Sequence, residues 1–338
     1  MNSREIVLQT LEFEKPLRVP RQIWGLQWSS RFFPDIVAKI KACYPDDILV
    51  APNCLKSVPR TKGEQFLKGT FTDEWGCEFC SLEDGVIGEV KNPLIKNWSD
   101  FNKIILPNEM LEVDIDKVNA FCIATDKFVY GPCCARPFER LQFLRGTENV
   151  FMDFIDNPDE INNLLRFIHG FYLKEIEVWV KTRIDGIAFM DDWGSQRGLL
   201  VSPAKWRELF KPLYKEYIDI AHKNGKKAFM HSDGYIVDII PDLIDIGLDA
   251  LNSQIFCMGP ENLTQFRGKL TFWGEIDRQH LLANGSTSEV ADAVWKVANS
   301  LYQNGGCIAQ CEFGPGAKPE NVETVFKTWN SVVIEGNN

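Results

Sequence analysis

The sequence predicts an α/β fold, a single (β/α)8 barrel, and two observations support this prediction. From about residue 127 onward, short apolar runs rich in β-forming residues alternate with long amphipathic segments, which is typical of parallel strands joined by helices. Two further apolar runs upstream bring the candidate strands to eight, the number that closes such a barrel. Neither an internal repeat nor a low-complexity linker interrupts the chain, so we expect one domain over residues 1–338.

Each candidate strand is a short apolar run that ends in a polar or glycine-containing segment. The eight runs lie at residues 20–25, 47–51, 128–131, 187–190, 227–230, 248–252, 270–273 and 307–310. In a parallel barrel the carboxyl ends of all strands meet at one mouth, where the active site lies. The polar residues that end these runs are therefore the first candidates for a functional site.

Helix signals separate the strands. Ser202 followed by Pro203 is typical of a helix start, and apolar residues then recur at helical spacing until Gly225. Ser286 and Glu289 form a capping-box pattern that begins another helix. These signals agree with strands and helices in alternation.

Residues 70–90 differ from the rest, because they alternate in polarity around an Asp-Gly turn. They predict a β-hairpin inserted near the barrel mouth. Glu74 and Trp75 in this segment are candidates for closing over a substrate, although an exposed acidic turn is the alternative. Cys77 and Cys80 form a lone Cys-x-x-Cys, for which packing is the favoured interpretation.

The composition, with 45% hydrophobic and 25% charged residues, is that of an ordinary globular protein. A net charge of −10 argues against nucleic acid or an anionic membrane as a partner, and no apolar run is long enough to cross a bilayer. Ten Cys lack the spacing of a disulfide framework, and the first residues are unlike a secretory signal. We therefore expect a cytoplasmic protein.

His231 ends the apolar run at residues 227–230, which places it at the expected mouth. Asp233 lies two residues later, so the two side chains share one face if the strand continues. This spacing suits two ligands of one cation, or a base with its orienting carboxylate. The alternative is that Asp233 belongs to a simple turn and His231 caps the core.

Asp191 and Asp192 also end a strand, beside Trp193. Adjacent residues on a strand face opposite ways, so one carboxylate should point into the mouth and act on the substrate. The other would then cap the following turn.

Cys311 follows the last apolar run and is a candidate third ligand. A Cys thiolate with His231 and Asp233 would make a three-ligand zinc site with one open position. The alternative, a small apolar residue in the core, is as common for a free Cys. The chain contains no GxGxxG, Walker or GxSxG motif, so nucleotide binding and serine hydrolysis have little support.

Several of these motifs together resemble the uroporphyrinogen decarboxylase superfamily. They lie at residues 191–194, 202–203, 227–234, 239–243, 274–277 and 315–322. The resemblance extends from about residue 16 to residue 329 and implies a single (β/α)8 barrel. The superfamily contains porphyrin decarboxylases and also zinc- and corrinoid-dependent methyltransferases.

Two departures favour the methyltransferase branch. The decarboxylase segment W-L-M-R-Q-A-G-R-Y-L-P corresponds here to W-G-L-Q-W-S-S-R-F-F-P, which begins at Trp24, keeps Arg31 and has Gln27 in place of the first Arg. A substrate with many carboxylates needs that positive charge. Cys311 occupies the position of a decarboxylase His, as Cys does in the methyltransferases. Asp47 matches the essential Asp of the decarboxylases, and the resemblance implies a catalytic role for it.

The methyltransferases of this superfamily bind zinc through a His-x-Cys pair and a later Cys, whereas the pair here is His231 with Asp233. A carboxylate makes the expected site harder, which fits activation of an oxygen such as that of a methyl ether. We expect Trp24, Trp75 and Trp193 to line the pocket. In addition, Glu275 in the matching segment at residues 274–277 is a candidate for substrate binding.

The resemblance implies a methyltransferase that takes a methyl group from a small O- or N-methylated compound. A corrinoid carried by a separate protein would accept the methyl group, because this chain shows no cobalamin-binding domain of its own. A decarboxylase of a small or porphyrin-like acid, supported by Asp47 and Arg31, is the enzymatic alternative. A binding protein or corrinoid chaperone that needs no metal is the non-enzymatic one.

Overall fold

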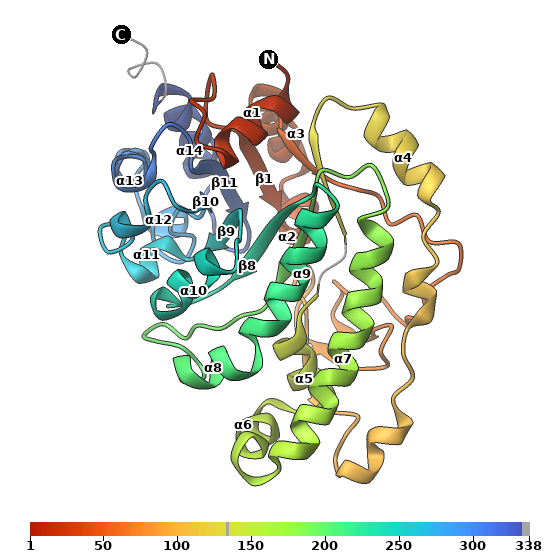
Figure 1. Ribbon diagram of the computed structural model, residues 1–338. Coiled ribbons are helices and arrows are strands. Elements are labelled where there is room, and N and C mark those ends of the chain that lie inside the picture. Colours follow the sequence, from red (N-terminus) through yellow and green to blue (C-terminus); the bar gives the residue numbers. More distant parts are fainter. Residues whose placement is uncertain (133–134, 333–338) are drawn as a thin grey trace.

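Eight parallel strands form a nearly closed barrel with helices outside it, which confirms the predicted (β/α)8 fold (Figure 1). The computed structural model describes residues 1–132 and 135–332. Hydrogen-bonded neighbours follow the order β1-β11-β10-β9-β8-β7-β6-β2. The strands are β1 Arg21–Gly25, β2 Ile48–Val50, β6 Phe128–Gly131, β7 Gly186–Met190, β8 Lys227–Ser232, β9 Ala250–Ser253, β10 Thr271–Trp273 and β11 Cys307–Phe313. All eight lie where the sequence predicts a strand.

The seam between β1 and β2 is closed by the residues that precede β2. The backbone N–H of Asp47 donates to the carbonyl of Arg21 at 2.8 Å, and the Asp46 carboxylate accepts from the N–H of Ile23 at 2.7 Å. Side chains thus replace part of the ladder at this seam, so few backbone groups are left unpaired.

Helices fill every connection between neighbouring strands around the barrel (Figure 1). The α-helices outside the barrel are α2 Gln27–Phe32, α3 Pro34–Cys43, α4 Ile115–Ile123, α5 Pro137–Arg145, α6 Thr147–Asp156, α7 Pro158–Trp179, α8 Pro203–Leu209, α9 Lys211–Lys223, α10 Ile240–Asp245, α11 Ile255–Met258, α12 Leu281–Asn284, α13 Thr287–Leu301 and α14 Pro319–Val332. The short 3-10 helices are η1 Trp98–Lys103, η2 Asn108–Leu111, η3 Val237–Ile239 and η4 Thr264–Phe266. None of the described helices has the length and apolar character needed to cross a membrane.

The predicted helix starts are present. Ser202 caps α8, where its hydroxyl accepts from the N–H of Lys205 at 3.2 Å, and Ser286 forms the expected capping box with Glu289 at the start of α13. The amphipathic segment after Ser202 is divided into α8 and α9, because Pro212 in the first turn of α9 cannot donate the hydrogen bond that would continue α8.

Two apolar cores stabilise the fold. The smaller one fills the barrel interior, and α1 (Ser3–Leu11) covers its N-terminal end. Its buried members are Val7, Leu11, Ile48, Phe128, Tyr130, Phe229, Ala250, Trp273 and Ile308. The larger core lies between the strands and the outer helices. The strand residues therefore divide into interior and outer faces by alternation.

The insertion predicted at residues 70–90 is a three-stranded antiparallel sheet rather than a two-stranded hairpin. Its strands are β3 Gly69–Thr72, β4 Glu78–Ser81 and β5 Glu89–Asn92, in the order β3-β4-β5. The sheet packs on helices α5 and α7, since the Phe79 ring meets Phe143 edge-on at 5.1 Å and the Trp75 ring meets Phe171 at 5.0 Å. The insertion shares a cavity with Asn53 and Pro132, which follow β2 and β6, so it lies beside the barrel mouth.

Candidate metal site at the barrel mouth

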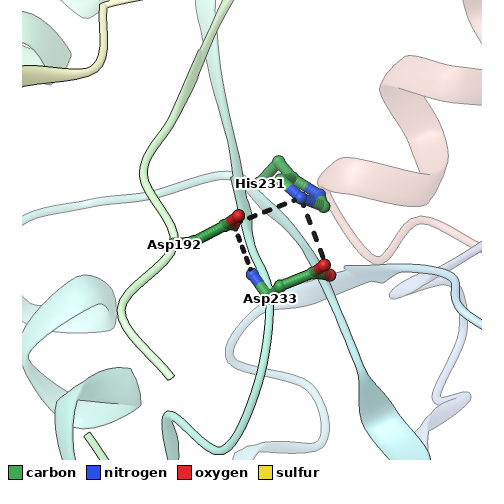
Figure 2. Close-up of side chains that lie close together, drawn as sticks. All are labelled: Asp192, His231 and Asp233. Carbon is green, nitrogen blue, oxygen red and sulfur yellow. Dashed lines mark hydrogen bonds and ion pairs between the residues drawn. The ribbon is translucent and has the colours of Figure 1, made fainter. Parts of the chain in front are cut away.

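Three side chains converge at the carboxyl ends of β7 and β8 (Figure 2). The His231 Nε2 atom lies 3.5 Å from Asp192 Oδ1 and 3.7 Å from Asp233 Oδ1. The backbone N–H of Asp233 also donates to Asp192 Oδ1 at 2.9 Å, which fixes the two carboxylates relative to one another. These residues end neighbouring parallel strands, so their convergence follows from the strand register, in which His231 pairs with Met190.

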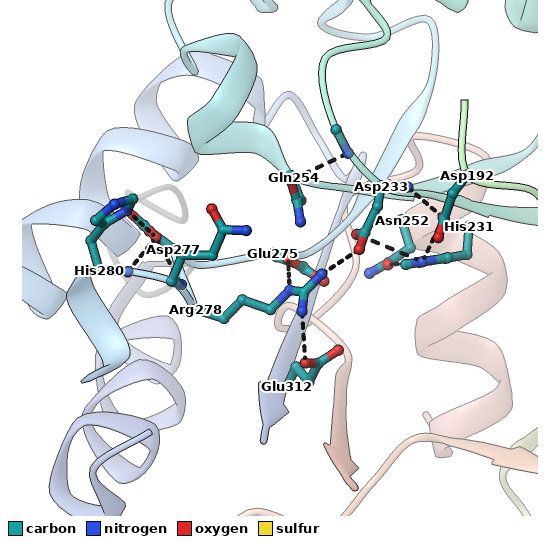
Figure 3. Close-up of polar contacts among 12 residues, drawn as sticks. Asp192, His231, Asp233, Asn252, Gln254, Glu275, Asp277, Arg278, His280 and Glu312 are labelled. Atoms are coloured by element: carbon teal, nitrogen blue, oxygen red, sulfur yellow. Dashed lines mark hydrogen bonds and ion pairs between the residues drawn. The ribbon is translucent and has the colours of Figure 1, made fainter. Parts of the chain in front are cut away.

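Asn252 at the end of β9 orients the His231 ring (Figure 3). The side-chain NH2 of Asn252 donates to the carbonyl of Trp273, so its Oδ1 atom faces His231 as an acceptor, 2.5 Å from Nδ1. The proton of a neutral imidazole therefore lies on Nδ1. The lone pair of Nε2 then points toward the two carboxylates.

Arg278 orients Asp233 from the opposite side (Figure 3). Its guanidinium binds Asp233 Oδ2, and also contacts Glu275 and Glu312, each at 3.2 Å. The other Asp233 oxygen, Oδ1, is buried without a hydrogen-bond partner anywhere in the described chain. One carboxylate oxygen is thus held by an Arg while the other is left facing His231.

The acidic surroundings shift the pKa values of these groups. Burial alone would lower the pKa of His231, but the charges of Asp233 and Asp192 outweigh it and raise that pKa above its ordinary value. Burial raises the pKa of Glu275 to about 8, although Arg278 opposes the rise. Several carboxylates, those of Asp192, Asp233 and Glu312 among them, surround one imidazole at this end of the barrel. Their negative charge attracts a cation.

The donor set fits a divalent metal ion. One imidazole nitrogen and two carboxylate oxygens, from Asp192, His231 and Asp233, all lie within 4.8 Å of one another. The unpartnered Oδ1 of Asp233 and the lone pair of His231 Nε2 are the kind of atoms that a metal would satisfy. Three protein ligands with an open position are the arrangement of catalytic zinc, and the two oxygens also suit harder cations.

The structure does not bring Cys311 to this site, which corrects the expectation that it is the third ligand. Cys311 is fully buried in the outer core, in the same apolar cluster as Val322 and Phe326 of α14. Residues alternate along β11, so the neighbouring Glu312 faces the interior and reaches Arg278. Burial raises the pKa of the Cys311 thiol far above its ordinary value, which leaves it neutral.

Asp191 and Asp192 divide as the alternation predicts. Asp191 is buried and accepts hydrogen bonds from the backbone N–H groups of Phe138 and Glu139 at 2.9 and 2.8 Å, and from the Tyr214 hydroxyl at 2.6 Å. It therefore anchors the N-terminus of α5 and has no free oxygen for a substrate. Asp192, whose side chain is 45% exposed, is the carboxylate that reaches the mouth.

Asp47 lies at the opposite end of the barrel from His231, which corrects the expectation of a catalytic role. It precedes β2, so it belongs to the N-terminal ends of the strands, where residues of a (β/α)8 barrel contribute to stability rather than to catalysis. Both its oxygens bind the Arg18 guanidinium at 2.6 Å. Burial, the largest influence, opposes ionisation, but the hydrogen bonds from Arg18, Ser3 and the Arg21 N–H and the charge of Arg18 together outweigh it and lower the pKa of Asp47.

The tryptophans expected around the pocket are separated. The Trp24 ring lies 5.6 Å from the His231 ring, at the site. Trp193 instead stacks on Phe138 at 4.1 Å within the outer core, away from the mouth. Trp75 belongs to the inserted sheet and lines a separate cavity beside it.

The other predicted substrate contacts also lie apart. Arg31 is half exposed and pairs with Asp84 of the insertion at 2.8 Å. Glu74 approaches Arg140 at 3.4 Å, in the cavity beside the inserted sheet. Glu275 contacts Arg278 and lines a smaller cavity of about 240 Å³ next to the triad.

Sequence reasoning missed Asn252, Arg278 and Glu312. Asn252 ends a predicted strand, so the rule that selected His231 also applies to it. Glu312 follows Cys311, and alternation from the interior residue Ile308 would have chosen it. Arg278 follows β10 by five residues and reaches back through a long side chain, for which the sequence carries no signal.

Comparisons with known proteins agree with this architecture. The family model for uroporphyrinogen decarboxylase matches residues 71–332. The chain belongs to the uroporphyrinogen decarboxylase family. A methyltransferase from Methanosarcina mazei has a similar structure, with a TM-score of 0.70 at 14% sequence identity, covering 98% of this chain and 99% of that one.

A second solved structure is more distant. A B12-independent methionine synthase from a Shewanella species matches with a TM-score of 0.46 at 14% identity, covering 95% of each chain. No curated protein matches the sequence. At 14% identity, the match to the Methanosarcina methyltransferase shows a shared fold alone.

Proposed function

We propose that this protein is a metal-dependent methyltransferase that takes a methyl group from a small O- or N-methylated compound and passes it to a corrinoid on a separate protein. The observation that carries the proposal is the triad of Asp192, His231 and Asp233 at the barrel mouth, in which Asp233 Oδ1 is buried without a hydrogen-bond partner in the described chain. Membership of the family and the fold shared with the Methanosarcina methyltransferase support it.

Asp192, His231 and Asp233 would hold zinc, or another divalent cation, which supplies Lewis-acid activation of the donor oxygen or nitrogen. Asn252 keeps the Nδ1 proton of His231 in place, and Arg278 holds one oxygen of Asp233 so that the other stays available. Each ligand is thereby oriented before a substrate arrives, which lowers the cost of reorganisation during reaction.

Glu275 is the group best placed to provide a proton to a departing oxygen or nitrogen. It is 2% exposed, and its pKa of about 8 keeps it protonated at neutral pH. Its Oε1 atom has no hydrogen-bond partner among the described residues, so that face is available to a ligand. Trp24 beside His231 adds an apolar surface that excludes water.

The decarboxylase alternative is weakened by where its residues lie. Asp47 is paired with Arg18 at the far end of the barrel, and Arg31 is paired with Asp84 at the surface. Neither lies with His231. A polycarboxylate would in addition meet the carboxylates of Asp192, Asp233 and Glu312 at the mouth, which repel it.

Metal analysis combined with a methyl-transfer assay tests the proposal. We expect the purified protein to bind about one equivalent of zinc and to consume reduced corrinoid in the presence of one member of a panel of methoxylated aromatics and methylated amines. His231→Ala should lose both zinc binding and the consumption of reduced corrinoid. His222→Ala, on the surface of α9, is the matched control and should keep both.

Two results would contradict the proposal. Release of carbon dioxide from a carboxylated substrate, without methyl transfer from any donor, would favour the decarboxylase. Full metal content in His231→Ala would place the metal elsewhere.

A further inference from the structure

A second cavity lies beside the triad, between the inserted sheet and helices α5 and α7. Its volume is about 550 Å³, enough for a small organic molecule. Aromatic side chains from all three elements line it, among them Trp75, Phe143 and Phe171. Glu139 also lines it, and the backbone N–H of Glu139 donates to Asp191, the neighbour of the triad residue Asp192. Glu139 therefore connects the lining of the cavity to the strand end that precedes the triad.

Carboxylates outnumber guanidinium groups in this cavity. Its charged lining residues are Asp73, Glu74, Arg136, Glu139, Arg140 and Glu175. Arg140 is held by Asp73 at 2.5 Å and by Glu74 at 3.4 Å. Arg136 approaches Glu139 at 3.8 Å. Both guanidinium groups thus have acidic partners. The four carboxyl groups that line the cavity outnumber the two guanidinium groups that could pair with them.

Glu175 on α7 is the carboxylate left over. It is 7% exposed and lines the cavity, yet it makes no hydrogen bond or ion pair with any other residue that the structure describes. Burial, the largest influence, and the nearby charge of Glu74 raise its pKa to about 8, against the opposing charges of Arg140 and Arg136. The carboxyl group of Glu175 therefore opens onto the cavity, where a ligand can supply the partner that the described residues do not.

The cavity already stabilises one cation with aromatic rings and carboxylates together. The Arg140 guanidinium carbon lies 5.0 Å from the Trp75 ring centre and 5.3 Å from that of Phe143. Cations over aromatic faces gain electrostatic energy that neutral groups of equal size do not. Phe171 and Tyr172 provide further ring surface close to Glu175 on the same helix.

We propose that this cavity binds a methylated ammonium ion, with its positive charge beside Glu175 and its methyl groups against the aromatic lining. The inference rests on the proposed function, for which it names the charged group by which the methyl donor is recognised. The metal would act on a different atom of that donor, because an ammonium nitrogen has no lone pair with which to bind a metal. An anionic donor such as a carboxylated aromatic ether fits this cavity poorly. Both of its guanidinium groups already have acidic partners, and its remaining carboxyl group, that of Glu175, would not attract an anion. A quaternary ammonium ion supplies both the charge and the apolar surface that the cavity complements.

The test compares choline with its uncharged isostere 3,3-dimethylbutan-1-ol, by isothermal titration calorimetry on the full chain at constant ionic strength. We expect choline to bind at least about tenfold more tightly. Glu175→Gln should remove roughly that advantage, while Glu177→Gln, an exposed site two residues along α7, should leave it unchanged. Both titrations need neither corrinoid nor turnover.

The wild-type protein gives a second measurement that does not depend on any variant. A cation prefers the ionised form of Glu175, so below a pKa of about 8 its binding must release a proton. The affinity for choline, whose charge does not titrate, should therefore rise with pH and level off above about 8, whereas that for the isostere should not rise.

The outcomes separate this inference from the proposed function. Equal affinity for choline and its isostere, or tighter binding of methoxybenzoate than of choline, would overturn the inference even if methyl transfer from an ether is observed. Choline binding that depends on Glu175, in a protein that transfers no methyl group, would uphold the cation site and contradict the proposed function.

Discussion

Replacing Asn252 by Leu should weaken metal binding although Asn252 touches no metal. The side chain joins His231 Nδ1 to the Trp273 carbonyl and so decides which imidazole nitrogen carries the proton. Leu has the same number of side-chain heavy atoms and is somewhat larger, but it can neither accept from Nδ1 nor donate to the carbonyl. The ring of His231 would then be free to rotate, and either of its nitrogens could carry the proton.

The substitution should change two quantities, the zinc affinity and the free energy of unfolding. Partners that orient a ligand His typically contribute about 10–100-fold to metal affinity, or roughly 1.4–2.7 kcal/mol. Asn252 is fully buried, so its replacement also removes a buried hydrogen bond to the Trp273 carbonyl, at about 1–3 kcal/mol of folding free energy. We therefore expect weaker zinc binding and a lower unfolding midpoint together.

A chelator competition at neutral pH measures the zinc affinity, and urea unfolding measures the stability. Asn321→Leu is the matched control for general destabilisation. Asn321 is also buried, and its side-chain NH2 donates to the carbonyls of Leu281, Leu282 and Gly285 at 3.1, 3.2 and 2.9 Å, away from the triad. The control should lose stability and keep its zinc affinity. Zinc affinity unchanged in Asn252→Leu, or lowered equally in both variants, would refute the reasoning.

Three further changes test the corrected assignments. Cys311→Ser should keep full metal content by elemental analysis, because the side chain faces the outer core, and should lose about 1–3 kcal/mol of stability by burying a hydroxyl. Asp47→Asn should cost about 1–3 kcal/mol in urea unfolding by breaking the pair with Arg18. Since the pKa of Asp47 is lowered in the folded state, that difference should shrink as the pH falls below the ordinary carboxyl range. Glu275→Gln should raise the melting temperature of the metal-free protein more at pH above about 8 than at acidic pH. The reason is that a folded-state pKa of about 8 makes folding take up a proton, so the wild type loses stability as the pH rises toward that value.

The eight strands could be predicted from the sequence because buried parallel strands are short apolar runs with polar ends, a pattern that depends on local residues alone. The same rule found Asp192, His231 and Asp233, which follow directly from strand ends. Whether the insertion had two strands or three could not be decided, because β5 at Glu89–Asn92 is short and mostly exposed and carries little apolar signal.

The errors arose where a residue type was weighed above its position. Cys311 is a candidate ligand because of its thiol, although alternation along β11 gives the interior position to Glu312. Asp47 was favoured by resemblance, although a residue before a strand lies at the N-terminal end of the barrel. Arg278 was out of reach, because the direction of a long side chain in a loop depends on tertiary contacts with Asp233 and Glu275.

The adjacent carboxylates after β7 join two parts of the molecule through a single peptide unit. Asp191 holds the first turn of α5, the helix whose side chains line the larger cavity, and Asp192 lies at the triad. An occupant that displaced α5 would pull on the backbone that carries Asp192. Any coupling free energy between the two sites is reciprocal. The factor by which zinc changes the affinity for a cavity ligand must therefore equal the factor by which that ligand changes the affinity for zinc.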